Sequence, residues 1–234
     1  MRVSFSGRTR PCQGRGGSSI LPTRTMKNIF FVRHGESEGN AGPSFQGPDS
    51  PLTEKGIEQA VIIAERCANL PINCLISSTL NRAKQTAEII SEKISIKVEY
   101  SDLFIENRRP TAQIGLIKDS KESQEIYRIV IDNFSKDNVH HSDEENFNDL
   151  NKRAEAALSF LVNRKEDNIL VVMHGLFLRV LFGRVVSGDN FSASVCLDLL
   201  RSIKTNNTGI TSFEYEEETN KWSVRTWNDH AHLG

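Results

Sequence analysis

The sequence predicts an α/β fold, namely a three-layer α/β/α sandwich with a mainly parallel central sheet. The first observation behind this prediction is that short apolar runs, typical of buried strands, alternate with longer segments whose apolar residues recur at helical spacing. The second is that polar or charged residues directly follow three of these runs. Because ligands of such sheets bind outside the carboxyl ends of the strands, a functional site is expected at that edge.

The first part of the chain alternates between predicted strands and helices. The apolar run at 28–33 ends in charge, and the stretch after it, rich in Gly, Pro, Ser and Asn, is typical of an irregular loop. Thr53 is a predicted helix N-cap, because apolar residues at helical spacing follow it. The predicted elements are, in order, a strand at 28–33, a loop at 35–51, a helix at 53–68, a strand at 74–77, a helix at 79–92 and a strand at 94–99.

The second part of the chain begins with a long polar connection, residues 107–145. A connection of this length usually carries function or is loosely ordered. We therefore interpret residues 107–145 as a polar insertion within a single domain that spans residues 26–234, and we expect it to cover the functional site. The remaining predicted elements are, in order, a helix near 122–133, a helix at 147–162, a strand at 168–173, a helix at 176–186 and strands at 209–215 and 222–227.

The composition is that of an ordinary globular protein and argues against several classes of function. Of the 234 residues, 38% are hydrophobic and 25% are charged, and the formal net charge is -1. This charge gives no electrostatic basis for binding nucleic acid or an anionic membrane. No apolar run approaches the roughly 20 residues that span a bilayer. The four cysteines form no CxxC pair, so neither a disulfide framework nor a zinc site is predicted, and a reduced, cytoplasmic setting is expected.

Residues 1–25 differ in composition from the rest of the chain. They carry five arginines and no acid, whereas residues 26–234 carry 24 basic and 30 acidic residues. The stretch is rich in Arg, Ser, Gly and Pro and lacks hydrophobic periodicity, which predicts a disordered basic extension. Its composition suits an organellar transit peptide, but it suits an upstream extension equally well, since Met26 would be a natural start before the first strand.

Three strand ends carry residue types that suit a phosphate site. Arg33 and His34 follow the first strand, Arg82 lies just beyond the second, and His174 follows the strand at 168–173. A guanidinium binds phosphate through two parallel hydrogen bonds, and phosphoryl transfer depends largely on positioning and positive charge. A neutral histidine can attack phosphorus, and neighbouring arginines keep a histidine neutral by lowering its pKa. The pattern therefore indicates phosphoryl transfer without a metal site or another cofactor.

Five segments of the chain resemble the histidine phosphatase superfamily, also called the phosphoglycerate mutase-like family. The segment at 31–40 is similar to the family's RHGxSxxN signature, and the other four occur after it in the family's order. The resemblance therefore extends over essentially all of residues 27–233. This ordered set is far more specific than a single RHG triplet. The segments are FVRHGESEGN at 31–40, SPLTEKGIEQA at 50–60, SSTLNRAKQTA at 77–87, VVMHG at 171–175 and NDHAHL at 228–233.

The resemblance implies a role for each candidate residue. It makes His34 the phosphate-accepting nucleophile and places Arg33, Arg82 and His174 around the transferred phosphate. It also makes Asn40 a substrate-binding residue. No metal or other cofactor is implied, since the arginines and histidines supply the positive charge.

The position of the proton donor is implied less specifically. In the family this donor is usually an acid a few residues beyond the strand that follows the Arg82 helix, and Glu106 lies there in DLFIENRRP at 102–110. Asp102 lies nearby, and the residues after Glu106 differ from the more familiar segment of the mutases. Glu106 is therefore the predicted proton donor, with Asp102 as the alternative.

The function implied by the resemblance is hydrolysis of a small phosphomonoester through a phosphohistidine. A phosphoglycerate mutase, which returns the phosphate to a second hydroxyl, is one alternative, and the lack of the mutase-like segment after Glu106 counts against it. A non-catalytic module that binds a phosphorylated ligand is another, and the intact set of four cationic or nucleophilic residues counts against that. Neither the substrate nor the oligomeric state is readable from the sequence.

Overall fold

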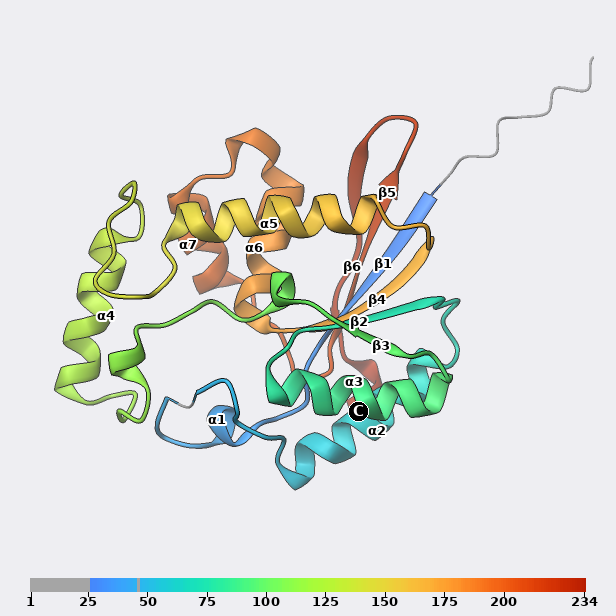
Figure 1. The fold of residues 1–234 in the computed structure, drawn as a ribbon, viewed down its shortest axis with the longest axis horizontal. Coiled ribbons are helices and arrows are strands. Elements are labelled where there is room, and N and C mark those ends of the chain that lie inside the picture. Colours follow the sequence, from blue (N-terminus) through green and yellow to red (C-terminus); the bar gives the residue numbers. More distant parts are fainter. Residues whose placement is uncertain (1–25, 46) are drawn as a thin grey trace, which may run out of the picture.

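The strand segments pair into one mixed sheet with helices on both faces (Figure 1). A computed structural model describes residues 26–45 and 47–234 of the chain. The basic extension expected at residues 1–25 lies outside the described residues. Within them, the strands are β1 (Met26–Arg33), β2 (Cys74–Ser77), β3 (Val98–Tyr100), β4 (Asn168–Met173), β5 (Ile210–Glu216) and β6 (Lys221–Asp229).

The strand order β3-β2-β4-β1-β5-β6 confirms the predicted, mainly parallel sheet. The four strands from β3 to β1 are parallel to one another, whereas β5 runs antiparallel to β1 and forms a hairpin with β6. The carboxyl ends of β1, β2 and β4 therefore lie at one edge of the sheet. At that edge Arg33, the last residue of β1, pairs with Met173, the last residue of β4.

Helices cover the two faces of the sheet and confirm the three-layer architecture (Figure 1). One face carries α2 (Glu54–Cys67) and α3 (Asn81–Ile94), and the other carries α5 (Phe147–Val162), α6 (Gly175–Ser187) and α7 (Ala193–Ser202). Two further helices, α1 (Glu38–Ala41) and α4 (Lys121–Asn133), lie in the connections beyond the carboxyl edge. None of the helices in the described ranges is both long and apolar enough to cross a membrane.

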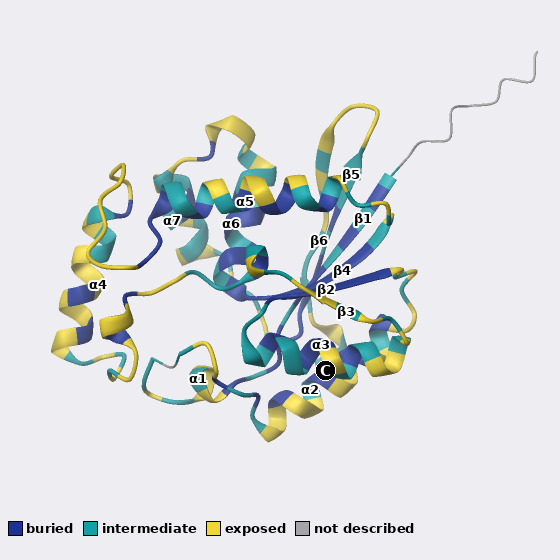
Figure 2. Cartoon of the chain, in the orientation of Figure 1, coloured by how far each residue is buried: buried dark blue, intermediate teal, exposed yellow. Residues whose placement is uncertain are grey.

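The central strands are covered on both faces, and Figure 2 shows β2 and β4 largely in dark blue, the colour of buried residues. In β1, Ile29 and Phe31 belong to the apolar core beneath α5 and α6, whereas Val32 packs into the core beneath α2 and α3. All three side chains are fully buried. Burial on both faces explains why these strands are continuous apolar runs in the sequence instead of alternating ones.

The chain that leaves β1 is pressed against the first turn of α2. Thr53 caps α2 as predicted, and its side chain accepts a hydrogen bond of 3.0 Å from the Gly56 amide. A Cβ on Gly35 would lie 2.4 Å from the carbonyl oxygen of Gly56, and a Cβ on Gly56 would lie 1.9 Å from that of Glu36. Only glycine fits at these two positions, so backbone contact fixes the segment after β1.

The structure departs from the sequence prediction at three elements. The short helix α1 lies within residues 35–51, which were predicted to be an irregular loop. The strand expected at 94–99 begins only at Val98, because α3 continues to Ile94 and Ser95 then turns the chain in the left-handed region at φ 57°.

The helix α7 was not predicted. Its apolar residues Val195, Cys196 and Leu199 recur at helical spacing and pack in or against the core. The helix spans only ten residues, however, and a short apolar segment does not distinguish a helix from a strand by its periodicity.

The insertion at residues 107–145 contains α4 at the predicted place and docks on the loop after β1. Ser44 and Ile117 form an antiparallel β-bridge, which joins the two segments through their backbones. The Lys118 ammonium donates to the carbonyl oxygens of Gly39 (2.9 Å) and Gly42 (2.6 Å). These contacts hold the insertion over the carboxyl edge of the sheet.

Candidate active site

His34 is the first residue beyond β1, and its ring is oriented by one hydrogen bond at each nitrogen. Its Nδ1 lies 2.7 Å from the carbonyl oxygen of Gly35, which can only accept, so Nδ1 carries the proton. Its Nε2 lies 3.1 Å from Nε of Arg82, which can only donate. The lone pair of His34 is therefore on Nε2, the nitrogen that faces the arginine.

The surroundings of His34 keep the imidazole neutral. Burial lowers the pKa of His34 well below its usual value of 6.5, and the charges of Arg82 and Arg33 lower it further. The side chain is only 2% exposed. A neutral ring with a free lone pair is the form of histidine that can act as a nucleophile.

Arg33 is anchored at one end of its guanidinium and unpaired at another atom. Its Nη1 donates to the carbonyl oxygen of Thr205 at 2.6 Å. Its Nε is buried and has no hydrogen-bond partner among the described residues. Because an unpaired donor of a buried guanidinium is costly, this atom is suited to bind an anion.

His174 follows β4 at the N-terminus of α6, and its ring lies beside that of His34. The two ring centroids are 5.0 Å apart. Its Nε2 lies 2.8 Å from the hydroxyl oxygen of Ser78, whereas its Nδ1 is buried without a partner among the described residues. Burial, followed by the charge of Arg82, lowers the pKa of His174 well below its usual value. His174 is thus a second neutral histidine with one nitrogen available.

A cavity of about 350 Å³ opens above His34 and contains Asn40, the predicted substrate-binding residue on α1. The Asn40 side-chain oxygen accepts a hydrogen bond of 3.4 Å from the side-chain nitrogen of Asn207. The charged side chains that line this cavity are those of Arg33, Arg82, Arg109, Lys118 and Glu106. Four cations against one carboxylate make the cavity suitable for an anion.

Glu106 lines the same cavity, and its carboxylate sits at the N-terminus of α6. It accepts hydrogen bonds from the backbone amides of Leu176 (3.2 Å), Phe177 (3.0 Å) and its own neighbour Asn107 (3.1 Å). Asp102 accepts a hydrogen bond of 2.5 Å from the Thr79 hydroxyl and lines none of the cavities around His34. The geometry therefore favours Glu106 over Asp102 as the carboxylate of the site.

The segment that carries Glu106 is clamped by a buried ion pair that sequence reasoning missed. Arg153 on α5 forms two hydrogen bonds with Glu145, of 2.8 and 2.7 Å, and donates to the carbonyl oxygen of Ile105 at 2.8 Å. Glu145 also accepts from the backbone amide of Arg108 at 2.9 Å. The pair thus holds the chain on both sides of Glu106. Glu145 precedes α5 and Arg153 is one of several charged residues within it, so the sequence offered no signal for this pair.

The location of Arg109 at the site was also not predictable from the sequence. Its guanidinium lies over the ring of Phe45, 4.5 Å from the centroid. No hydrogen bond or ion pair to another described residue holds it, and it lines the cavities on both sides of Glu106. Arg128, another cation of the insertion, lines neither of these cavities.

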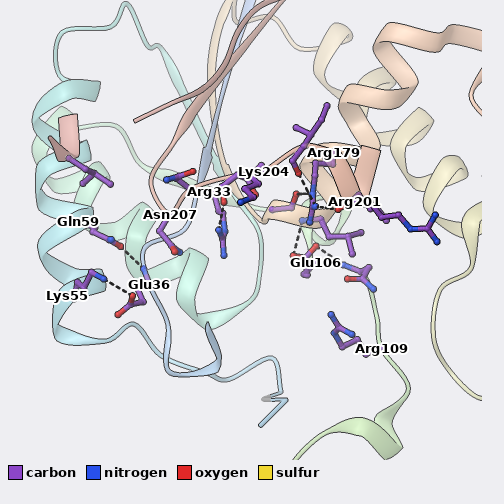
Figure 3. A pocket seen from close by; sticks show the side chains of 18 residues that line it. Arg33, Glu36, Lys55, Gln59, Glu106, Arg109, Arg179, Arg201, Lys204 and Asn207 are labelled. Carbon is purple, nitrogen blue, oxygen red and sulfur yellow. Dashed lines mark hydrogen bonds and ion pairs between the residues drawn. The ribbon is translucent and has the colours of Figure 1, made fainter. Parts of the chain in front are cut away.

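A larger cavity of about 740 Å³ adjoins the first and shares Arg33, Glu106 and Arg109 with it (Figure 3). Arg179, Arg201 and Lys204 add further positive charge to its lining. Arg179 is held by the carbonyl oxygens of Gly175, Leu200 and Ile203. The two cavities together accommodate a molecule considerably larger than a phosphate ion.

No group of three or more His, Cys, Asp and Glu side chains in the described ranges is arranged to hold a metal ion. Among the histidines of the insertion, His140 is paired with an acid, because its Nε2 lies 2.6 Å from a carboxylate oxygen of Asp149.

The two buried histidines predict that the protein loses stability below about pH 6.5. Because the pKa values of His34 and His174 are lowered in the folded protein, the unfolded chain binds more protons in this range. Each histidine should lower the free energy of unfolding by about 1.4 kcal/mol for each pH unit below 6.5, until its folded pKa is reached. Urea unfolding at pH 7.5 and pH 5.5 measures the difference, and His174→Gln should reduce it.

The exposed residue His141 provides the control for this prediction. His141→Gln should leave the pH dependence of stability unchanged. A wild-type protein that is equally stable at both pH values would contradict the prediction.

Over most of its length, the chain is similar to proteins of known family. A family model described as histidine phosphatase superfamily (branch 1) matches residues 29–230. The probable phosphoglycerate mutase GpmB of Salmonella arizonae is 30% identical over 213 residues, which cover 89% of this chain and 95% of the relative. The match includes all five segments that carry the sequence resemblance except for the last three residues of the fifth.

Solved structures share the fold. YhfR of Bacillus stearothermophilus has a TM-score of 0.74 and 26% identity, with 88% of this chain and 99% of that chain covered. Phosphoserine phosphatase of Entamoeba histolytica, solved in complex with 3-phosphoglyceric acid, has a TM-score of 0.70 and 21% identity, with 88% and 99% covered. At 21% identity, the second likeness is evidence of the fold alone.

Proposed function

Because the chain belongs to the histidine phosphatase superfamily (branch 1), we propose that it hydrolyses a small phosphomonoester through a phosphohistidine formed on His34. One observation carries this proposal: the lone pair of His34 is on Nε2, in a buried site beside Arg82 and at the floor of a cationic cavity. The nucleophile is thus neutral and correctly oriented, and the charge that an incoming phosphate needs surrounds it.

In the first step, the substrate phosphate takes the hydrogen bonds of the site. Its oxygens accept from Arg82, which frees Nε2 of His34 to attack phosphorus, and from the unpaired Nε of Arg33. Ser78 accepts from the Leu80 amide, so its hydroxyl hydrogen is free to donate to Nε2 of His174. With Nε2 as an acceptor, the single proton of the neutral His174 ring is on Nδ1, which can donate a hydrogen bond to a phosphate oxygen.

Glu106 completes the step by protonating the leaving oxygen. The P–O bond to the alcohol breaks as the P–Nε2 bond forms, and the alcohol leaves with the proton of Glu106. In the second step Glu106 takes a proton from water, the water attacks phosphorus, and the P–Nε2 bond breaks to release inorganic phosphate.

Activity is expected to survive chelation of divalent metals. In the proposed mechanism Arg33, Arg82 and His174 stabilise the charge that a metal ion supplies in other phosphatases, so EDTA removes nothing essential. The measurement is the rate of phosphate release with and without EDTA. A large loss of rate that added Mg²⁺, Mn²⁺ or Zn²⁺ restores would contradict the mechanism.

Mutase activity is the second candidate, and the name of the GpmB relatives favours it. A mutase must hold its product long enough to return phosphate to another hydroxyl, whereas a hydrolase admits water to the phosphohistidine. The open cavities beside Glu106 favour entry of water. Incubation with 3-phosphoglycerate, with and without 2,3-bisphosphoglycerate, distinguishes the two by ³¹P NMR. We expect inorganic phosphate, and accumulation of 2-phosphoglycerate would establish the mutase instead.

The substrate is proposed to be a small phosphorylated metabolite whose leaving alcohol occupies the larger cavity. The volume of about 740 Å³ and the lining by Arg109, Arg179 and Arg201 suit a polar molecule that carries further negative charge. A screen of phosphomonoesters in metal-free buffer tests this, with sugar phosphates, phosphorylated amino acids, phosphoglycerates and nucleotides in the panel. A protein that binds these compounds and releases phosphate from none would be a binding module.

A further inference from the structure

The backbone of the nucleophile is held by a loop that is remote in sequence, residues 203–209, which we call the support loop. Within it, the Thr205 carbonyl oxygen accepts from the Arg33 guanidinium at 2.6 Å. The Thr208 amide donates to the Arg33 carbonyl oxygen at 2.9 Å, and the Asn207 side chain donates to the His34 carbonyl oxygen at 2.9 Å. A shift of this loop would therefore move both Arg33 and His34.

The support loop is held in a conformation that its own residues disfavour. Thr208 is fully buried and has a φ of 56°, in the left-handed region that a β-branched residue rarely adopts. Such strain costs on the order of 1–3 kcal/mol and persists only where the surroundings impose it. Contacts from outside the loop must therefore stabilise it.

The first of these contacts comes from Asn228 at the end of β6. Its side-chain oxygen accepts from the Asn206 amide at 2.7 Å, and its side-chain nitrogen donates to the Asn206 side-chain oxygen at 3.0 Å. Asn228 also lies close to Gly209, where an added Cβ would come within 2.3 Å of the Asn228 oxygen. The paired amides thus fix one end of the support loop.

The second contact comes from His232 in the final turn, η4 (Ala231–Leu233), which packs against α2. The Thr208 hydroxyl donates to the Asn207 carbonyl oxygen at 2.8 Å, so it accepts from Nε2–H of His232 at 3.1 Å. Nδ1 of His232 in turn accepts from Arg66 at 3.2 Å, and Arg66 is ion-paired with Asp229. Burial and then the charge of Arg66 lower the pKa of His232, which is consistent with this neutral tautomer.

We propose that residues 228–232 form a C-terminal clasp that positions Arg33 and His34 for phosphoryl transfer by holding the support loop. Asn228 and His232 are its two positioning residues, and neither lines the cavity above His34. The inference rests on the proposed function, because that function makes His34 the group that must be positioned. It adds a role for the end of the chain, which is remote from the other site residues in sequence.

Three variants of the full-length protein test the clasp. His232→Ala removes the bond to Thr208, and His232→Gln restores a side-chain N–H donor to that hydroxyl. The control His141→Ala changes an exposed histidine outside the clasp. We expect kcat for p-nitrophenyl phosphate to fall about 10- to 100-fold in His232→Ala, with a smaller change in KM, since misplacement by about 1 Å costs this much. His232→Gln should regain most of the rate, and His141→Ala should equal the wild type.

Hydrogen exchange of the Thr208 amide gives a readout that does not depend on activity. This amide should exchange faster in His232→Ala than in His141→Ala, while the unfolding temperatures of the two variants stay within a few degrees of each other. Asn228→Asp, which keeps the acceptor for the Asn206 amide but loses the donor, should show a smaller change in the same direction.

The clasp and the proposed function fail in different ways. Equal kcat and equal exchange in His232→Ala and His141→Ala would overturn the clasp. A His232→Gln variant as slow as His232→Ala would also overturn it, because the bond to Thr208 would then not be what positions the loop. A wild-type protein without turnover or a phosphohistidine would overturn the proposed function, while the exchange experiment would still test the support of the loop.

Discussion

Replacement of His34 by alanine is expected to abolish turnover. The substitution removes the atom that bonds to phosphorus, not a binding contact, so no alternative route remains through the same site. Removing a catalytic nucleophile typically lowers kcat by a factor on the order of 10,000 or more. The steady-state rate with p-nitrophenyl phosphate measures the loss, and KM is not expected to explain any part of it.

The covalent intermediate gives a direct test of the same assignment. Phosphohistidine is labile in acid and stable in base, so a rapid alkaline quench with ³²P-labelled substrate should trap a labelled wild-type protein. His34→Ala should carry no label, whereas the control His141→Ala, at an exposed histidine, should be labelled like the wild type. Full labelling of His34→Ala would assign the nucleophile to another residue, and the partly available His174 would be examined first.

Replacement of Glu106 by glutamine is expected to have an effect that depends on the leaving group. The side-chain amide of the variant cannot supply a proton to the departing alkoxide, and general acid catalysis typically contributes about 100- to 10,000-fold. Alkyl phosphates should therefore lose most of their rate, whereas an activated aryl phosphate, whose leaving group needs no proton, should lose much less. The amide retains one oxygen, so it can still accept from α6 and preserve part of the local structure.

Single-turnover kinetics are needed for this comparison. Glu106 also activates water in the second step, so hydrolysis of the phosphohistidine could become rate-limiting in the variant and hide the first step. The rate of phosphoenzyme formation should be measured for one alkyl and one aryl ester, with Asp102→Asn as the matched control. Equal losses for both esters in Glu106→Gln would remove it from the role of acid, and a loss confined to alkyl esters in Asp102→Asn would assign the role to Asp102.

The central part of the site was predictable because its residues follow strands that can be recognised in the sequence. Arg33, His34 and His174 directly follow buried apolar runs, and the parallel order of the sheet brings such positions to one edge. Arg82 lies on the first turn of a well-marked helix and reaches His34 from there. The positions of these four residues follow from the order of the strands and helices, without knowledge of the loop conformations.

The surrounding residues were not predictable for the opposite reason. Arg109 reaches the cavity because the insertion docks on the loop after β1, and no periodicity encodes that docking. Glu145 and Arg153 clamp the chain beside Glu106 across a long stretch of intervening sequence. The support loop contains no apolar pattern, and its conformation is imposed by Asn228 and His232. Long-range polar contacts of this kind have no local signature.

The pairing of β1 with β4 has a consequence for how activity arises during folding. Asn28 pairs with Asn168, so the two central strands can meet only after a loop of about 140 residues has closed. Closing such a loop costs entropy before any contact compensates for it, and chains with many distant contacts fold slowly. His34 and His174 lie at the ends of these two strands and become neighbours only at that stage. Enzymatic activity should therefore appear among the last events of refolding, later than the helical signal, and no fragment that lacks either strand should retain it.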